Sequence, residues 1–462
     1  TGTRVNEDYL IEDVPYNFVT YSEEIKSTNS WTIQSGITVT NNDVLAPNGT
    51  LTADKLVGNG TVGVFKQVTN LDGVVTRSVY LKSVTGNVSV TIKDPVLTQT
   101  TKTLNLNETW QRYTLTEDNL HTGSIQGIWI DDIPASGIYM WGAQIVKGDQ
   151  PKEYLKTTDR LDIPRIDYTN GEPSILLEPS RTNLITYSNE FTNATWSKSN
   201  VTITANQAVS PEGIQNADKY SGTTLGQNLS IPISVSDNFS YFLYVKYINA
   251  PFIRLRVDSI STWFNIETIE VATNGFADAS IEDVGNGWRK ITVINTSFSG
   301  SFANAFIHPH ATDNTTNEQD GGEFFLYGAQ LEAGSYATSL IHTSGSAVTR
   351  SQDRADNAGN SDLINSTEGV FYLQFAALTG AGAFDDLSLS DGTQNNKVQL
   401  FYRATDKINA RVTVGGVNVF DHIYQSIDMT QFEKVALKWK LNDFSMYVDG
   451  REVDSDSSGA TF

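Results

Sequence analysis

The sequence contains no cysteine among its 462 residues. Disulfide bonds, cysteine nucleophiles and zinc sites built on thiolates are therefore excluded. Methionine occurs only three times and the strong helix formers are not clustered, whereas Thr, Ser, Asn, Gly, Val and Ile are abundant. This composition predicts an all-β protein with long polar loops.

Long apolar segments are also missing. No run approaches the roughly 20 residues that a membrane helix needs, so we expect no membrane insertion, and no signal peptide opens the sequence. Residues 1–4 lack methionine and begin in the middle of a strand-like pattern. We therefore expect the sequence to be a segment of a longer protein.

Positive charge is scarce, because 32 Lys and Arg residues face 53 Asp and Glu residues and leave a net charge of −21. Nucleic acids reward clustered cations through the release of counterions, so nucleic-acid binding is not expected. The same excess disfavours anionic membrane surfaces. We interpret it first as an aid to solubility.

Six short motifs occur twice in the same order, at a nearly constant offset. The pairs are 21–25 with 187–191, Trp31 with Trp196, 47–56 with 211–220, 80–82 with 244–246, 110–113 with 288–291, and 139–145 with 325–331. Ordered matches of this kind indicate a duplicated domain. The repeated unit is much longer than a solenoid repeat, so each copy should bury its own core.

Extended runs with two-residue alternation, separated by turn residues, predict β-sandwiches throughout the chain. Residues 1–20 form a lead-in that continues from an upstream region, and residues 21–160 and 184–345 form two jelly-roll modules. Between the modules, residues 161–183 form a β-hairpin linker with Asn170 and Gly171 at its turn. A polar connector spans 346–362. Residues 363–462 form a third all-β domain, with Asp449 and Gly450 in a hairpin turn and its final strands expected beyond the sequence.

A resemblance follows from three stretches taken together. These are LLEPSRTNLITYSNEF at 176–191 followed by Trp196, SPEGIQNADKY at 210–220, and YGAQLEAGSYATSLIHTSGSAVTRSQDRAD at 327–356. In this order they resemble the carbohydrate-binding-module-like jelly rolls of bacteriophage virion proteins, chiefly tail fibres. The segment from about Leu363, with KVALKWKLNDFSMYVDG at 434–450, resembles a concanavalin A-like (laminin-G-type) domain.

This resemblance implies a non-enzymatic virion appendage, of the tail fibre or head fibre type, that adheres to a bacterial surface glycan. It also implies other virion proteins as partners, assembly as a homotrimer, and localisation in the virion. The lack of cysteine suits a protein that is made in bacterial cytoplasm and released by lysis. Two alternatives stay open: a purely structural spacer or decoration without a ligand, and the binding part of a polysaccharide depolymerase. The sequence has no coiled-coil heptads that would hold three chains together.

Related binding modules place an aspartate on the last strand, where it helps to hold a structural calcium ion. Both copies here read Gly-Ala-Gln at that position, at 142–144 and 328–330. Without the carboxylate a calcium site is not expected there. We expect no metal ion and no cofactor.

His308, His310 and Asp313 form the one histidine cluster with metal-ligand spacing. Pro309 argues against a regular central strand, so we interpret the cluster as a surface loop. His121, His342 and His422 are interpreted as structural or exposed. Arg254 and Arg256 alternate with apolar residues, which places them on one strand face that we interpret as solvated.

Paired acids could suggest glycosidase chemistry, which needs two carboxyl groups about 5 to 10 Å apart across a cleft. The pairs are Asp131 with Asp132, Asp385 with Asp386, and Glu282 with Asp283. Neighbours on a strand point to opposite faces, so we interpret these pairs as turns and solvated faces. No catalytic residue is predicted, and no nucleophile elbow, Walker loop or Rossmann loop is present.

Aromatic side chains are the remaining candidates for sugar binding. The repeated tryptophans Trp31, Trp196, Trp110 and Trp288, together with Trp141, are interpreted as core residues. Sugar-stacking aromatics should instead be exposed in loops or on a sheet face. The carbohydrate-binding candidates are Trp263 in the second module and Tyr402 and Tyr424 in the third domain.

Overall fold

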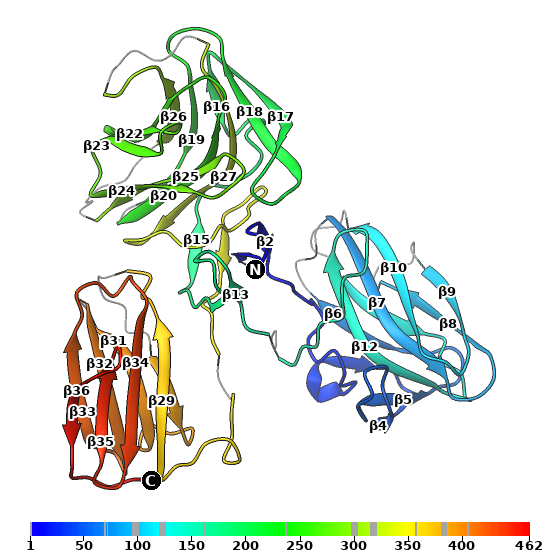
Figure 1. Ribbon diagram of the computed structural model, residues 1–462. Coiled ribbons are helices and arrows are strands. Elements are labelled where there is room, and N and C mark those ends of the chain that lie inside the picture. Colours follow the sequence, from blue (N-terminus) through cyan, green and yellow to red (C-terminus); the bar gives the residue numbers. More distant parts are fainter. Residues whose placement is uncertain are drawn as a thin grey trace. The chain divides into compact units, whose positions relative to one another are not determined.

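The computed structural model describes residues 2–68, 71, 73–94, 101–119, 126–159, 163–235, 238–296, 304–314, 321–355, 358–379, 386–403 and 406–462. Within these ranges the regular structure is β-strand apart from one short 3-10 helix, η1 (Ser27–Asn29). No described helix has the length and apolar character needed to cross a membrane. The predicted all-β class is therefore confirmed. The chain divides into two compact units, Asp13–Arg165 and Gly2–Glu12 together with Ile166–Phe462 (Figure 1).

The first unit contains module one, a sandwich of two five-stranded antiparallel sheets. The sheets have the orders β10-β7-β12-β5-β4 and β3-β6-β11-β8-β9. The strands are β3 (Trp31–Ile33), β4 (Thr38–Val44), β5 (Ala53–Val57), β6 (Val64–Val68), β7 (Gly73–Ser83), β8 (Val88–Lys93), β9 (Thr101–Leu106), β10 (Gln111–Asn119), β11 (Gln126–Asp131) and β12 (Ile138–Lys147). From β5 to β12 the chain crosses between the sheets at every step except β8 to β9, which is the connectivity of a jelly roll.

Module two, in the second unit, repeats this connectivity with two six-stranded sheets. Their orders are β17-β18-β27-β20-β25-β24 and β16-β19-β26-β21-β22-β23. The strands are β16 (Ser197–Ser199), β17 (Val201–Val209), β18 (Gln215–Gly222), β19 (Asn228–Pro232), β20 (Phe239–Tyr247), β21 (Phe252–Val257), β22 (Ile260–Asn265), β23 (Glu270–Asn274), β24 (Asp278–Asp283), β25 (Trp288–Asn295), β26 (Asn304–His310) and β27 (Glu323–Ala333). Tandem jelly rolls are thus present as predicted.

Asn17 and Asn183 show that the duplication extends to single hydrogen bonds. In module one the Asn17 amide donates to the carbonyls of Ala143 and Leu155, and its Oδ1 accepts from the N–H groups of Val19 and Ile145. The corresponding partners of Asn183 are Ala329, Ile341, Ile185 and Leu331. One buried side chain therefore joins the start of each module to its last strand and to the segment that follows it.

The first tryptophan of each module also occupies one equivalent place. The indole N–H of Trp31 donates to the carbonyl of Tyr21, and the indole N–H of Trp196 donates to the carbonyl of Tyr187. Both rings are almost fully buried, at 2 % and 1 % exposure. The prediction that the repeated tryptophans are core residues is confirmed for these two, and also for Trp141 and Trp288.

The Gly-Ala-Gln motif forms a bulge in the last strand of each module. Gly142 and Gly328 have φ values of 64° and 62°, which a residue with a Cβ adopts only with strain. Beyond the bulge, Gln144 Oε1 accepts from the N–H of Leu155 at 2.7 Å, and Gln330 does the same with Ile341 at 2.6 Å. A carboxamide bonded to backbone thus occupies the position discussed above for calcium.

Short two-stranded sheets are formed by segments that precede or follow module two in the chain. They are formed by β1 (Thr3–Val5) with β2 (Ile11–Asp13), β13 (Ile166–Asp167) with β14 (Ser174–Ile175), and β15 (Arg181–Asn183) with β28 (Val348–Arg350). The β13–β14 pair confirms the predicted hairpin, and Gly171 has the positive φ of 86° that its turn requires. Residues of the predicted lead-in contact module two, since the Ile11 N–H donates to the carbonyl of Pro211.

The third domain is a sandwich of two four-stranded sheets around a common core. The strands are β29 (Glu368–Phe375), β30 (Asp386–Ser390), β31 (Lys397–Arg403), β32 (Lys407–Val414), β33 (Val417–Gln425), β34 (Glu433–Lys440), β35 (Phe444–Val448) and β36 (Arg451–Asp456). The sheet orders are β29-β34-β35-β36 and β30-β31-β32-β33. Asp449 and Gly450 both have positive φ, at 47° and 77°, so the predicted hairpin turn is confirmed.

Candidate functional site

The outer side of the sheet β3-β6-β11-β8-β9 in module one carries a group of aromatic and charged side chains that contact one another. Ile128 and Ile130 on β11 point into the core, so Trp129 between them points outward. The pairing register places Phe65 on one side of Trp129 and Lys93 on the other. We call the outward group Phe65, Thr91, Lys93, Trp129 and Asp131 the aromatic face of module one.

Lys93 connects the charged and aromatic parts of this face. Its Nζ lies 3.9 Å from the centre of the Trp129 ring and 2.5 Å from Oδ2 of Asp131. Phe65 packs on Trp129 with its ring centre 5.0 Å away. A cation over an indole ring gains about 0.5–2 kcal/mol, depending on its exposure to water. The three side chains therefore hold one another in a defined arrangement on an otherwise polar sheet face.

Two polar atoms of the aromatic face lack hydrogen-bond partners among the described residues. They are Nε1 of Trp129, a donor, and Oδ1 of Asp131, an acceptor, and both are shielded by protein atoms. A buried polar atom without a partner costs about 1–3 kcal/mol. A hydroxyl group both donates and accepts, so its chemistry is complementary to either atom.

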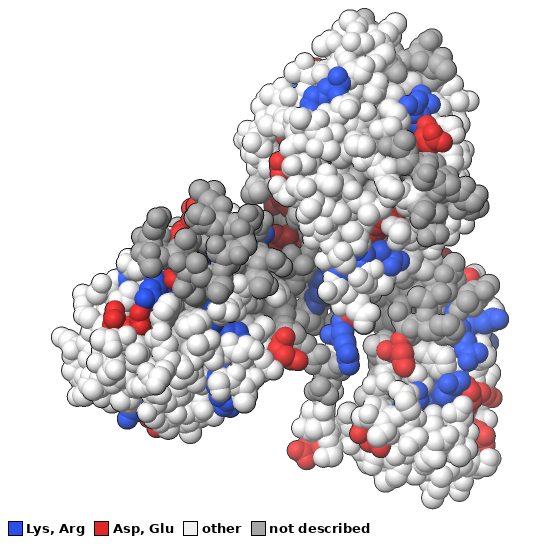
Figure 2. Space-filling view, turned by 180° about the vertical axis from the view of Figure 1, so that it is seen from behind, with Lys and Arg blue, Asp and Glu red and all other residues white. Residues whose placement is uncertain are grey.

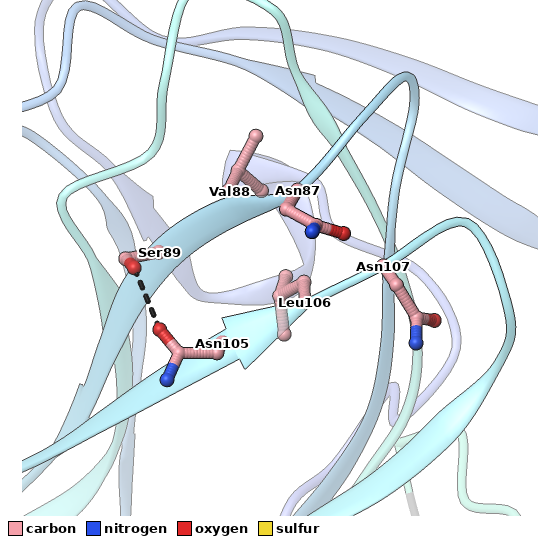
Figure 3. A pocket seen from close by; sticks show the side chains of 6 residues that line it. All are labelled: Asn87, Val88, Ser89, Asn105, Leu106 and Asn107. Atoms are coloured by element: carbon pink, nitrogen blue, oxygen red, sulfur yellow. Dashed lines mark hydrogen bonds between the residues drawn. The ribbon is translucent and has the colours of Figure 1, made fainter.

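A hollow lies where β8 begins and β9 ends, and it is lined by residues from both strands. Figure 3 shows its lining residues, Asn87, Val88, Ser89, Asn105, Leu106 and Asn107, around a volume of about 430 Å³. Ser89 Oγ donates to Oδ1 of Asn105 at 2.9 Å. Asn87, just before β8, and Ser89, Thr91 and Lys93 within it alternate on the outward side. At roughly 3.3 Å per residue they make a polar strip roughly 20 Å long.

Module two carries the same kind of pair at the equivalent register. Phe65 lies opposite Thr32, the residue after Trp31, and Ser230 lies opposite Ser197, the residue after Trp196. On the next two strands of module one, the residues in line with Phe65 are Trp129 and then Lys93. In module two, the residues in line with Ser230 are Phe306 and then Arg256. The Arg256 guanidinium lies 3.8 Å from the centre of the Phe306 ring. Both copies thus place a cation over an aromatic ring at one position, although neither residue type is retained.

The histidine cluster is not the predicted surface loop. His308 and His310 lie within β26, at 3 % and 0 % exposure, and the pairing of β26 with β21 continues through Pro309 to His310. Pro309 is tolerated because the pairing of β26 with β19 ends at Ile307, so no ladder hydrogen bond is required from it there. Asp313 binds Thr273 instead of the histidines. In the described ranges no three acidic or histidine side chains form a group that could hold a metal ion.

The candidate sugar platforms of the sequence are less exposed than that role requires. Tyr402 is 3 % exposed within the core of the third domain, and its hydroxyl donates to the carbonyl of Thr379. Tyr424 is half-buried against the same core. Trp263 is 8 % exposed, and Arg254 lies over its ring at 4.8 Å. The expected exposure of Tyr402 and Trp263 is therefore wrong, because strand alternation or an arginine covers each ring.

The two arginines predicted to be solvated are half-buried instead. Arg254 stacks on Trp263 and donates through Nε to Ser261, and Arg256 stacks on Phe306. Their aliphatic stems cover aromatic surface, which a sequence pattern of alternating charge does not reveal.

The acidic pairs are engaged with neighbouring side chains. Asp131 binds Lys93, and Oδ2 of Asp132 accepts from Thr91 Oγ1 at 2.6 Å. The expectation of opposite faces is wrong for this pair, because Asp132 has a φ of 60° and turns back to the side of Thr91. Asp283 pairs with Arg289. Asp385 and His121 lie outside the described residues, His342 contacts Glu212, and His422 contacts Asp454.

Sequence reasoning missed Trp129, although a signal was present. Trp129 alternates with Ile128 and Ile130 and precedes Asp131, so it must lie on the polar side of a half-buried strand. It also has no tryptophan counterpart in the second copy, unlike Trp31 and Trp110. Trp110 was predicted to be a core residue, but it is only half-buried, with its indole N–H donating to the carbonyl of Leu45.

No family model and no curated protein matches the sequence. Among solved structures it is similar to the N-terminal tandem CBM22-1–CBM22-2 domain of Paenibacillus barcinonensis Xyn10C. The identity is 16 %, the match covers 70 % of this chain and 98 % of that chain, and the TM-score is 0.27.

Proposed function

We propose that the chain is a non-enzymatic carbohydrate-binding protein and that the aromatic face of module one is a glycan-binding site. The observation that carries the proposal is the cation–aromatic pair that both modules place at one register position of an outward sheet face. A core position would retain apolar packing alone, whereas these pairs combine an aromatic ring with a charged group. Sugars need that combination, because a sugar ring offers an apolar face and a rim of hydroxyl groups.

Each residue of the face has a role in this proposal. Trp129 and Phe65 provide apolar surface for a sugar ring, and Lys93 and Asp131 bind its hydroxyl groups. Lys93 has a long flexible stem, so its ammonium group can leave the indole ring when a sugar arrives. The polar strip with Asn87 and Ser89 lengthens the site beyond a single sugar, which favours an oligosaccharide or polysaccharide over a monosaccharide.

We further propose that the protein acts as an adhesion appendage of a bacteriophage virion that binds a bacterial surface glycan. The support is the sequence resemblance to virion fibre modules, together with the polar, acidic surface of the chain. Other virion proteins would then be its partners and the virion its location. A homotrimer would add avidity, since several weak sites facing one surface bind more tightly than one. Light scattering on the longest natural form of the chain tests that assembly: a monomer contradicts it.

The test of glycan binding uses the whole chain on an array of bacterial surface polysaccharides. We expect wild type to bind at least one polysaccharide and Trp129→Ala to bind it at least tenfold more weakly, since loss of a stacked aromatic costs roughly 1–3 kcal/mol. Tyr139→Ala is the matched control. Tyr139 lies on the outward side of the other sheet, where Lys82 Nζ sits 5.1 Å from its ring centre, so the same kind of pair is removed elsewhere.

Three outcomes contradict the proposal. Absence of wild-type binding to every host polysaccharide favours a spacer without a ligand. Equal losses for Trp129→Ala and Tyr139→Ala would show that the site is elsewhere. Shortening of the bound polymer on incubation with the full-length protein would favour the polysaccharide depolymerase.

A further inference from the structure

The third domain carries a second polar cluster, on the outer side of the sheet β30-β31-β32-β33. Leu400 and Ala410 point into the core, so the alternating residues Phe401 and Arg403 on β31 point outward. Lys407, Asn409 and Arg411 on β32 face the same way, because they lie opposite outward residues of β31. We call the group Phe401, Arg403, Lys407 and Arg411 the cationic face. Figure 2, the view from behind, shows Lys and Arg side chains on this domain with Asp and Glu side chains beside them.

Arg403 and Lys407 lie directly opposite each other across β31 and β32. Two like charges in directly opposed positions destabilise a sheet. Among the described residues no carboxylate forms an ion pair with either side chain, and Nε of Arg403 has no hydrogen-bond acceptor. Asp406, next in the chain to Lys407, accepts from the N–H of Met429 instead. Within the described part of this acidic chain, two cations thus lie together and neither forms an ion pair with a carboxylate.

The rest of the face holds its cations in position. The guanidinium groups of Arg403 and Arg411 lie 5.5 and 4.9 Å from the centre of the Phe401 ring. Arg411 donates to Oδ2 of Asp421 at 3.0 Å, and Asn409 donates to Oδ1 at 2.7 Å. Although burial opposes it, these contacts hold the pKa of Asp421 below its ordinary value. Arg411 binds the Asp421 carboxylate directly, and the charge of the more distant Arg403 also helps to lower the pKa of Asp421, whereas Lys407 has no part in this lowering.

Polar groups beside the cations suit a hydroxylated ligand. Gln399 donates to Asp386, and its Oε1 has no donor within the described part of the chain. Ser388, opposite Gln399 on β30, is exposed. A ligand that carries one carboxylate and several hydroxyl groups matches this set better than an inorganic anion, because the carboxylate pairs with a guanidinium fork and the hydroxyl groups bind amides.

We propose that the cationic face binds a carboxylate-bearing sugar unit of an acidic polysaccharide, with the carboxylate held between Arg403 and Lys407. The acidic surface elsewhere repels a polyanion, so binding is confined to this face. The site is separate from the aromatic face of module one and does not depend on it.

Affinity electrophoresis of the whole chain through gels that contain polygalacturonate tests the proposal at low ionic strength. We expect wild type to be retarded and the double variant Arg403→Gln/Lys407→Gln to bind at least tenfold more weakly, because each charged hydrogen bond contributes about a factor of ten. The matched control is Lys434→Gln/Lys440→Gln, which changes the charge equally on the outer side of the opposite sheet. It should bind like wild type. Trp129→Ala should also bind like wild type, which keeps this test independent of module one.

Methyl-esterified polygalacturonate has the same backbone without the charge and should not retard the protein. The proposal is overturned if the Arg403→Gln/Lys407→Gln variant binds as tightly as wild type, if the esterified polymer binds equally, or if wild type is retarded by none of polygalacturonate, alginate and hyaluronate. Displacement of the polymer by inorganic phosphate at no higher concentration than by free galacturonate would overturn the assignment to a sugar.

Discussion

The Lys93 ammonium nitrogen lies over the Trp129 indole ring, 3.9 Å from the ring centre, and the same nitrogen binds the carboxylate of Asp131. The arrangement orients the largest aromatic group on the outward sheet face of module one. In module two Arg256 stands in the same relation to Phe306. Both copies therefore keep a cation over an aromatic ring at this position, although the residue types differ.

A substitution can distinguish what the charge of Lys93 contributes to glycan affinity from what its aliphatic stem contributes. Lys93→Met keeps the aliphatic stem over Trp129 but removes the ammonium group and leaves Asp131 without its partner. We expect affinity for the glycan of module one to fall about three- to tenfold, less than for Trp129→Ala, because the apolar contact survives. Equilibrium binding of both variants measures the difference. Equal affinity of Lys93→Met and wild type would show that the cation only shields the ring.

The equivalent asparagines predict equivalent losses of stability. Asn17→Ala and Asn183→Ala each remove a side chain that makes four hydrogen bonds to backbone groups in a buried place. We expect each to lower the free energy of unfolding by about 2–4 kcal/mol, since the backbone groups are left unsatisfied. Hydrogen exchange of Val19 and Ile185 reports each module by itself. Unchanged protection of either amide in its variant contradicts the equivalence.

Lys66 predicts a pH dependence of stability in the alkaline range. The side chain is 2 % exposed, and burial lowers the pKa of its ammonium group from 10.5 to about 8. Between pH 8 and 10.5 the unfolded chain binds more protons at this group than the folded chain. The buried charge therefore lowers the free energy of unfolding by its full amount below pH 8. This loss becomes smaller as the pH rises toward 10.5.

Lys66→Met removes this titration. We expect wild type to gain stability relative to Lys66→Met as pH rises from 8 to 10.5, and chemical denaturation of both proteins across that range measures the difference. Other lysines and tyrosines titrate equally in both proteins and cancel. A constant difference between the two proteins across this range contradicts the prediction.

Glu178 and Arg350 form a buried ion pair that joins the segment before module two to the segment after it. Arg350 Nη1 donates to Glu178 Oε2, and Glu178 also accepts from the N–H and hydroxyl of Ser339 at 2.7 Å. Both side chains are 4 % exposed. We expect Arg350→Met to lower the free energy of unfolding of this unit by about 3–5 kcal/mol, because Glu178 is left charged and buried.

The double variant Glu178→Gln/Arg350→Met measures the interaction energy between the two residues separately from their contacts with other residues. It should be less destabilised than the sum of the two single variants, since no uncompensated charge remains. Denaturant unfolding of the four proteins measures the coupling. Additive losses would show that the two residues act independently.

The sequence by itself determined the architecture of the modules. Two-residue alternation fixes which side of a strand meets the core, and the ordered repeats of Trp31 with Trp196 and of the two Gly-Ala-Gln motifs predicted the duplication. Turn chemistry placed the hairpins at Gly171 and at Asp449 with Gly450. These features are local, because each depends on φ preference or on the alternation of neighbouring residues.

Tertiary structure alone decided which side chains meet across strands. Trp129 and Lys93 are 36 positions apart in sequence, and only the register of β11 on β8 makes them neighbours. The same holds for Phe306 with Arg256. Arg403 and Lys407 are close in sequence, but their direct opposition depends on where the β31–β32 turn places the register. Pro309 was misread because its tolerance depends on where β19 stops pairing. Tyr402 became core rather than platform because its strand faces a second sheet. The alternation of residues along a strand determines which face of the sheet each side chain lies on. The register and the packing of the sheets determine which side chains it contacts, and both depend on contacts between residues distant in sequence.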